Sequence, residues 1–105
     1  MDKEKVKDII KYLKKALITS NINAEYIALF GSYLNNTATE ESDLDLIIIS
    51  SDFENKDIFE RAELTQKPEI GTLKKFMVPM DILNLTPEEY KESQKNGFYK
   101  SRIVA

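Results

Sequence analysis

The sequence predicts a single small α/β (α+β) domain, in which helical and extended segments follow one another along 105 residues. Two short apolar runs, Tyr26–Phe30 and Asp43–Ser50, have the length and composition of strands. Apolar residues at helical spacing precede the first run, and a helix-start signal follows at Thr86. Because a chain of this length has room for only one small core, residues 1–105 are expected to form one domain.

The first predicted helix covers Lys3–Thr19. Its apolar residues recur at helical spacing: Val6, Ile9, Ile10, Leu13, Ala16 and Leu17. Six lysines up to Lys15 lie between them, offset by three acidic residues, which is typical of a solvated helix face. A polar loop, Ser20–Asn23, then leads to the first strand.

The two predicted strands are separated by a polar segment. Tyr26–Phe30 is interpreted as a buried strand, and Gly31–Ser42 as a helical turn followed by a loop. In the second strand, Asp43–Ser50, successive side chains point to opposite faces. One face carries Leu44, Leu46 and Ile48, and the other carries Asp43, Asp45, Ile47 and Ile49.

The segment after the second strand is predicted to be helical and then extended. Asp57–Thr65 has helical character, and Pro68 either ends that helix or opens another one. Phe76–Leu85 is interpreted as a third strand. Pro79 within it favours a sheet edge or a strand start, because proline cannot donate a ladder hydrogen bond.

The last predicted helix has clear boundaries. Thr86 can act as the N-cap, Pro87 takes the first helical position, and Glu89 completes a capping box. Gly97 is expected to end this helix after Asn96. The remaining tail, residues 98–105, is half apolar.

The composition restricts the chemistry that this chain can carry out. Histidine and cysteine are both absent, which excludes Ser-His-Asp triads, disulfides and zinc sites built from thiolate or imidazole. A bound metal must therefore have oxygen ligands, as hard cations such as magnesium or manganese do. The net charge of −3, from 15 basic and 18 acidic residues, argues against a nucleic-acid binder that depends on a cationic face.

No segment has the pattern of a secretory leader or a membrane span. The N-terminal residues Met1–Lys5 carry mixed charge, and the apolar run Leu46–Ile49 is only strand-sized. We therefore expect a soluble, cytoplasmic protein that does not insert into a membrane.

The candidate catalytic residues begin with a pair of carboxylates. Asp43 and Asp45, two apart in a strand, project from one face about 7 Å apart. Carboxylates held together among apolar residues repel each other, and a divalent cation that bridges them relieves this repulsion. Asp81 lies among apolar neighbours in the third predicted strand. If that strand pairs with the second, Asp81 completes the metal cluster and can accept a proton from an attacking hydroxyl.

A candidate phosphate site precedes these acids. Gly31 and Ser32 lie where a strand meets a turn. Glycine lets the backbone approach a phosphate closely, and the serine hydroxyl with nearby amide N–H groups can donate to phosphate oxygens. The sequence therefore predicts a phosphate cradle followed, ten residues later, by a metal-binding carboxylate pair.

In these residues the sequence resembles the nucleotidyltransferase superfamily that includes DNA polymerase beta. The matching residues are Gly31-Ser32, Asp43-x-Asp45 and the later Asp81. The length and the lack of an appended domain are similar to its minimal nucleotidyltransferase (MNT) branch, and the resemblance extends along the whole chain. It implies a small mixed β-sheet with flanking helices, the polymerase beta-like nucleotidyltransferase fold.

The resemblance also implies an activity. Members transfer a nucleoside monophosphate, here expected to be AMP from ATP, to a hydroxyl group with two magnesium ions held by three carboxylates. Gly31 and Ser32 would then hold the triphosphate, Asp43 and Asp45 would bind the metals, and Asp81 would be the third ligand and base. Some minimal members are antitoxins that adenylylate a tyrosine on a ribonuclease toxin of the HEPN type. A small helical partner protein is therefore expected.

The chain departs from the family pattern at two positions. Many minimal members have an arginine directly after the Gly-Ser pair and a glycine three residues later, where this chain has Tyr33 and Asn36. Asn36 is expected to adopt the left-handed conformation of that glycine. The missing arginine removes a phosphate contact. Lys74, Lys75 and Arg61 are candidate replacements, although Arg61 and Lys75 are more typical of surface charges.

Two other functions stay open. The chain could be a non-catalytic binding module that neutralises a helical partner by direct contact, which the missing arginine and the small core favour. It could also transfer a nucleotide to a small molecule such as an aminoglycoside, although enzymes of that kind usually have a second domain. Tyr33 and Tyr99 are expected to contact the core or a partner rather than to accept a nucleotide.

Overall fold

A four-stranded mixed sheet is the centre of the fold, with strand order β3–β2–β1–β4. The computed structural model describes residues 1–97 and 100–105. β1 pairs antiparallel with both β2 and β4, whereas β2 and β3 are parallel. The strands are β1 Tyr26–Phe30, β2 Leu44–Ile49, β3 Met80–Leu85 and β4 Ser101–Ile103.

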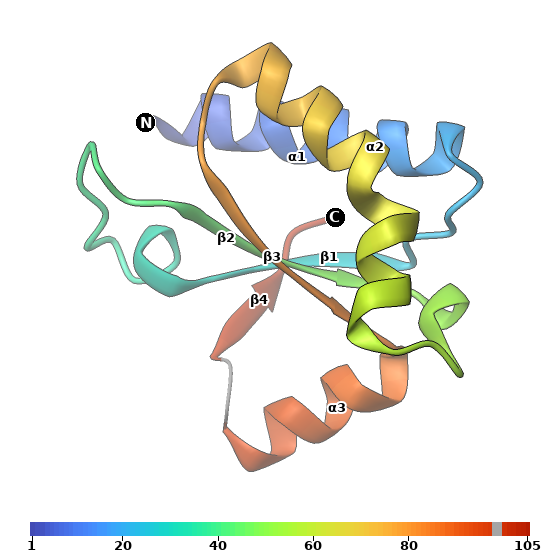
Figure 1. Ribbon diagram of the computed structural model, residues 1–105. Helices are drawn as coiled ribbons and strands as arrows, with labels where there is room; N and C mark the ends of the chain where they lie inside the picture. The colour runs from blue at the N-terminus through green and yellow to red at the C-terminus, as the bar shows by residue number, and fades with distance from the viewer. Residues whose placement is uncertain (98–99) are drawn as a thin grey trace.

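Helices cover both faces of this sheet (Figure 1). α1 and α2 lie together on one face, and the shorter α3 lies on the other. The helices are α1 Lys3–Thr19, α2 Ile58–Phe76 and α3 Pro87–Asn96, with 3-10 turns η1 Gly31–Tyr33 and η2 Ser51–Phe53. The structure is thus the small mixed α/β fold with flanking helices that the sequence predicts.

The hydrophobic core is divided unequally between the two faces. The larger cluster joins α1 to one face of the sheet and includes Leu44, Leu46 and Ile48 of β2. The smaller cluster, on the α3 face, contains Ala28, Ile47 and Ile49. The predicted alternation of β2 is therefore confirmed, and Asp45 shares the lightly covered α3 face because it lies two residues before Ile47.

The first half of the chain folds as predicted, with small shifts at the ends of β2. α1 and β1 have the predicted bounds, and Asp2 caps α1 by accepting a hydrogen bond from the Lys5 N–H at 2.8 Å. Asp43 and Ser50 fall just outside the ladder of β2. The Ser50 hydroxyl instead donates to the carbonyl of Asn23 at 2.7 Å, which ties the strand end to the loop after α1.

The prediction for Pro68 is wrong, because α2 continues through it and Asp57–Thr65 is only its first part. Proline has no N–H, so the carbonyl of Leu64 loses its usual helical donor. Leu64 is 37% exposed and so lies on the solvent side of α2. The carbonyl of Pro68 itself accepts a hydrogen bond from the hydroxyl of Thr72 at 2.8 Å. Burial of one helix face on both sides of the proline, at Arg61, Thr65, Pro68 and Thr72, thus maintains the helix despite the lost hydrogen bond.

In the last third of the chain, β3 is shorter than predicted, α3 is confirmed and β4 was not predicted. β3 begins at Met80, directly after Pro79, because the segment from Phe76 first completes α2. Thr86, Glu89 and Gly97 form the predicted capping box and left-handed helix end. β4 forms in the tail, and Tyr99 lies outside the described residues.

No helix among residues 1–97 and 100–105 is long and apolar enough to span a bilayer.

Candidate active site

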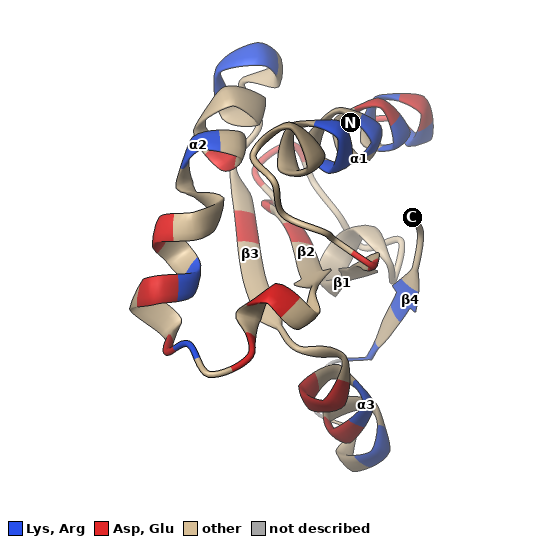
Figure 2. Ribbon diagram, turned by 90° about the vertical axis from the view of Figure 1, so that its right-hand side faces the viewer, with Lys and Arg blue, Asp and Glu red and all other residues tan. Residues whose placement is uncertain are grey.

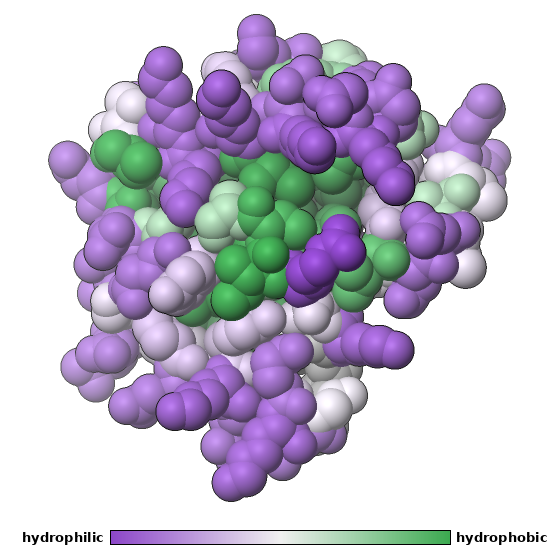
Figure 3. Space-filling view, turned by 180° about the vertical axis from the view of Figure 1, so that it is seen from behind, coloured by the Kyte–Doolittle hydropathy of each residue, from purple (hydrophilic) through white to green (hydrophobic). Residues whose placement is uncertain are grey.

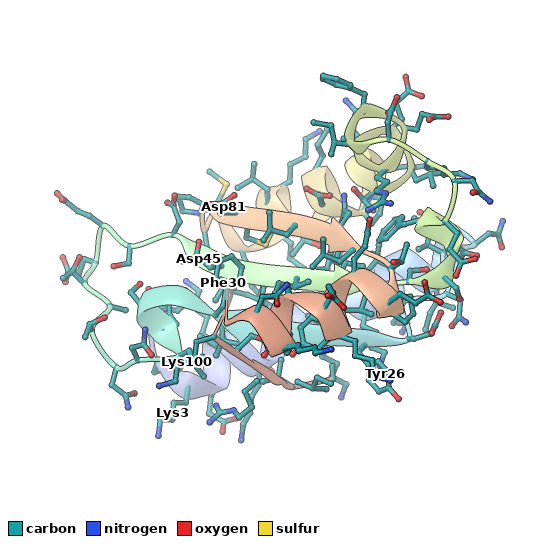
Figure 4. The ribbon with its side chains drawn as sticks, turned by 90° about the horizontal axis from the view of Figure 1, so that it is seen from below. Lys3, Tyr26, Phe30, Asp45, Asp81 and Lys100 are labelled. Carbon is teal, nitrogen blue, oxygen red and sulfur yellow. The ribbon has the colours of Figure 1, made fainter. Side chains whose placement is uncertain are left out.

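Two of the predicted acids lie side by side on neighbouring strands. Asp45 of β2 and Asp81 of β3 are direct partners in the parallel register, so their Cα atoms are about 4.8 Å apart. Acidic positions of β2 and β3 are adjacent in Figure 2, and Figure 4 shows both labelled side chains at one end of the sheet. The third strand therefore pairs with the second, as the predicted grouping of Asp81 with the other acids required.

Gly31 lies directly against one of these carboxylates. It follows β1 with φ +73°, in the left-handed region that favours glycine. A Cβ atom placed on Gly31 would overlap Oδ2 of Asp45 and come within 2.9 Å of its Cγ. The glycine is thus required for two reasons: its backbone conformation and the space that the Asp45 carboxylate takes.

The electrostatics of the site oppose the ionisation of Asp45. Partial burial raises the pKa of Asp45, and the charges of Asp81 and Asp43 raise it further. Among the residues that the structure describes, no ion pair involves any of these three acids. The group thus has an excess of negative charge that the neighbouring chain does not neutralise.

Asp43 is nearby but less well fixed. It is exposed and lies one residue before β2, outside the ladder. The loop that leads to it is held by Ser42, whose hydroxyl oxygen accepts a hydrogen bond from the Thr39 N–H at 2.8 Å. Within the described part of the chain, no three acidic side chains converge as an assembled metal cluster. The structure therefore joins Asp45 and Asp81, with Asp43 within electrostatic range.

The Gly-Ser turn is well ordered by local hydrogen bonds. Gly31 and Ser32 open η1, where the N–H of Leu34 donates to the Gly31 carbonyl at 3.1 Å. Tyr33, in the position of the missing arginine, packs against the larger core cluster, as predicted. Asn36 has φ +58°, the left-handed conformation expected of it.

The donor set suits a hard divalent cation. Carboxylate oxygens are the ligands that magnesium and manganese prefer, and histidine and cysteine are absent. The mutual repulsion of the acids fits a bound cation, and the missing side chain of Gly31 leaves room for the Asp45 carboxylate. Asp45 and Asp81 are the residues best placed to hold one.

Arg61 is neither a surface charge nor available for a phosphate, contrary to both predictions. It is 9% exposed, and its guanidinium donates to Glu89 and to the carbonyls of Lys56 and Asn84 at 2.6–3.2 Å. Lys75 lies over the rings of Tyr12 and Phe76, which pack with α1 and α2. These contacts place its ammonium group on the opposite face of the sheet from Asp45.

Three residues of the site region, Phe30, Lys100 and Ser101, were not identified from the sequence. In register, Phe30 lies beside Asp45 and Ser101 lies beside Phe30, so a row runs across the sheet to β4. Extending that register by one residue places Lys100 opposite Gly31, and Figure 4 shows Lys100 on the η1 side of the site. The half-apolar tail was the only signal for β4, and a three-residue strand is too short for period-two patterning to reveal.

Comparison with known proteins identifies related sequences and folds. The nucleotidyltransferase domain family matches residues 4–105. No curated protein matches the chain. A solved structure from Sulfolobus solfataricus, described as a nucleotidyltransferase, has a TM-score of 0.58 and 19% identity, over 98% of this chain and 87% of that one. At this identity the likeness shows the fold alone.

A second solved structure is described as a toxin–antitoxin with AMP-PNP. It has a TM-score of 0.50 and 26% identity, over 74% of this chain. Because the match covers 56% of that chain, the present chain corresponds to only part of it.

Proposed function

The chain belongs to the nucleotidyltransferase domain family, and from this premise we propose that it transfers AMP from ATP to a hydroxyl group on a partner protein. Members of this family generally use a nucleoside triphosphate and a divalent metal ion. For this chain we propose magnesium, with two ions held by Asp43, Asp45 and Asp81. We further propose that residues 1–105 act as one catalytic domain in the cytoplasm.

The observation that carries this proposal is the pairing of Asp45 with Asp81 beside the bare α-carbon of Gly31. Transfer of a nucleotidyl group needs negative charge to be neutralised at the triphosphate and at the attacking oxygen. Carboxylates that repel each other favour cation binding at this position. When bound, the metal would supply charge neutralisation and an activated acceptor oxygen.

The remaining steps are assigned to the chain's own residues. Gly31 and the Ser32 hydroxyl would hold the triphosphate, with Lys100 as the cation beside them. The acceptor oxygen attacks the α-phosphorus, the bond to the β-phosphate oxygen breaks, and pyrophosphate leaves. Asp81 would accept the proton of the hydroxyl, because it is exposed at the start of β3 and lies next to Asp45.

A protein acceptor is supported by one relative. The toxin–antitoxin structure with AMP-PNP supports a nucleotide and a partner protein for a related fold. We therefore propose an antitoxin role, with a small helical toxin of the HEPN type as the acceptor.

Label transfer tests this function directly. The purified chain is incubated with magnesium and ATP labelled at the α-phosphate in lysate from its source cells. We expect one labelled polypeptide with the wild-type chain and a loss of about 10³-fold or more in Asp43→Asn and Asp45→Asn. Asp8→Asn, which removes an exposed carboxylate from α1, is the matched control and should label normally.

The fold of each variant is checked by thermal unfolding in EDTA. Asp45→Asn should be at least as stable as wild type, because it removes a repelled charge. Full labelling by both site variants would refute nucleotidyl transfer at these residues. Neutralisation of a toxin that persists without the acids would favour the non-catalytic binding module. Label found only on a small molecule would refute a protein acceptor.

A further inference from the structure

A large apolar groove runs along α1 on the back of the molecule. It has a volume of about 1060 Å³ and lies between α1, the segment after η1, and the end of the chain after β4. Its floor is aliphatic and includes Val6, Ile10, Leu29, Leu34 and Val104. Figure 3 shows this apolar surface exposed in the middle of that face, with hydrophilic side chains around it.

The rim of the groove is strongly basic. It carries Lys3, Lys7, Lys11, Lys14, Lys15 and Arg102. Asp2 is the one acidic residue among the described residues that line it. Thus six of the 15 basic residues line this groove, together with one of the 18 acidic residues. The groove is therefore positively charged, although the net charge of the chain is −3. Figure 2 shows the same concentration of basic residues on α1.

We propose that this groove docks an acidic amphipathic helix of a partner protein. Apolar side chains on one face of the helix would fill the floor, and flanking Glu or Asp residues would meet the lysines. The groove follows α1 from Lys3 to Ile18, about 22 Å at 1.5 Å per residue. A helix of about four turns matches this length.

The chemistry of the groove favours a helix over a nucleic acid. Bases bind to proteins by stacking on aromatic side chains, and Tyr33 is the one aromatic residue among the described residues that line the groove. The aliphatic floor matches leucine-like side chains instead. A second copy of the chain is also disfavoured, because the helix that borders the groove, α1, would bring its own lysines against the same rim.

The groove is connected to the candidate active site through one segment. Gly31 and Ser32 open this segment at the site, while Tyr33, Leu34 and Asn36 line the groove a few residues later. A partner docked in the groove would therefore contact the segment that continues from the Gly-Ser turn, while Asp45 and Asp81 lie on the opposite face of the sheet. In this respect the inference rests on the proposed function, since it supplies the docking surface for the protein acceptor. Binding can nevertheless be measured without any nucleotide.

The test is a binding titration with a designed probe. A labelled peptide of about fifteen residues has leucine at i, i+3, i+4 and i+7 and glutamate elsewhere. Its fluorescence anisotropy should rise on titration with the full chain at low salt and fall as salt is added. Ile18→Glu should weaken this binding by about tenfold without unfolding, because Ile18 is 61% exposed.

Matched charge reversals locate the binding surface. The groove variant combines Lys7→Glu, Lys11→Glu and Lys14→Glu, and the control variant combines Lys67→Glu, Lys91→Glu and Lys95→Glu. Both change the net charge equally, and the control lysines are exposed and lie outside the groove. We expect loss of at least about tenfold in affinity for the groove variant only.

Several results would overturn the proposal. Equal binding of a sequence-scrambled peptide, or equal loss in both triple variants, would show that only net charge is being measured. Binding of a single-stranded oligonucleotide in place of the acidic peptide would identify a nucleic-acid surface. Sedimentation of the chain alone as a dimer that dissociates in Ile18→Glu would identify a second copy as the occupant. Because none of these readouts involves transfer, failure here is distinct from failure of the proposed enzyme activity.

Discussion

Two regions of the molecule place carboxylates at partly buried positions, with opposite electrostatic results. At the α2–β3–α3 junction, Glu89 accepts from Arg61 at 2.6 and 3.2 Å, and these hydrogen bonds lower its pKa. At the start of β2 and β3, Asp45 meets Asp81 instead of a cation, and burial together with its acidic neighbours raises its pKa. The surroundings of Glu89 favour its ionised form, whereas the surroundings of Asp45 disfavour its ionised form.

This difference distinguishes a charged residue that stabilises the fold from one that is available to bind a ligand. The Arg61–Glu89 pair joins two helices and a strand, so it contributes to the stability of the folded chain. The acids at the strand ends make no such bridge among the described residues. A fold retains charges of this kind most readily where a ligand neutralises them, and perturbed carboxylates of this type are typical of active sites.

Among the tests of this comparison, the largest expected effect concerns the close approach of Gly31 to Asp45. Gly31→Ala should lower activity by about 10²-fold or more, because the new Cβ displaces the Asp45 carboxylate by roughly an ångström. It should also lower the free energy of unfolding by about 1–2 kcal/mol through left-handed strain. Initial rates and chemical denaturation measure the two effects separately.

Gly97→Ala is the matched control for this prediction. Gly97 has φ +72°, so alanine incurs the same backbone strain, but the described residues leave the space within 4 Å of its added Cβ free. The control should lose stability and keep activity. Equal activity in the two variants would show that the Gly31–Asp45 contact has no role in the reaction.

A moderate effect is expected for Lys100, which the extended register places opposite Gly31. Lys100→Met should raise the triphosphate concentration needed for half-maximal rate by about tenfold, since one charge-assisted contact to phosphate is lost. The maximal rate should change little. Steady-state kinetics with Lys67→Met, an exposed lysine of α2, as the control provide the comparison. An unchanged half-saturation value would exclude Lys100 as a replacement for the missing arginine.

The smallest effect is expected at the paired carboxylate. Glu89→Gln should destabilise the protein by no more than about 1 kcal/mol at neutral pH, since the Glu89 side chain is 45% exposed. A lowered pKa means that this contribution is present above the ordinary value of 4.5 and is lost as pH falls through the lowered pKa. Urea unfolding of both proteins between pH 7 and pH 3 should therefore converge in acid. A difference that grows towards low pH would contradict the assigned cause.

Local signals in the sequence predicted most of the fold. The bounds of α1, β1 and α3 follow from apolar periodicity and capping residues, both of which act within one or two helical turns. The passage of α2 through Pro68 could not be predicted, because it depends on the tertiary burial of one helix face that carries Arg61, Thr65, Pro68 and Thr72. β4 could not be predicted either, since its pairing partner lies more than seventy residues earlier in the chain.

For the candidate site, the sequence by itself determined which residue types are present and how they are spaced. Residue type and spacing were enough to identify the candidate residues Gly31, Ser32, Asp43, Asp45 and Asp81. Only the tertiary structure decided that β3 is parallel to β2 in the register that joins Asp45 to Asp81, and that Arg61 is occupied by Glu89. It also decided that α1 leaves an apolar groove open beside its lysines. The physical reason is that periodicity and capping are local, whereas register, charge pairing and groove formation depend on residues that are distant in sequence.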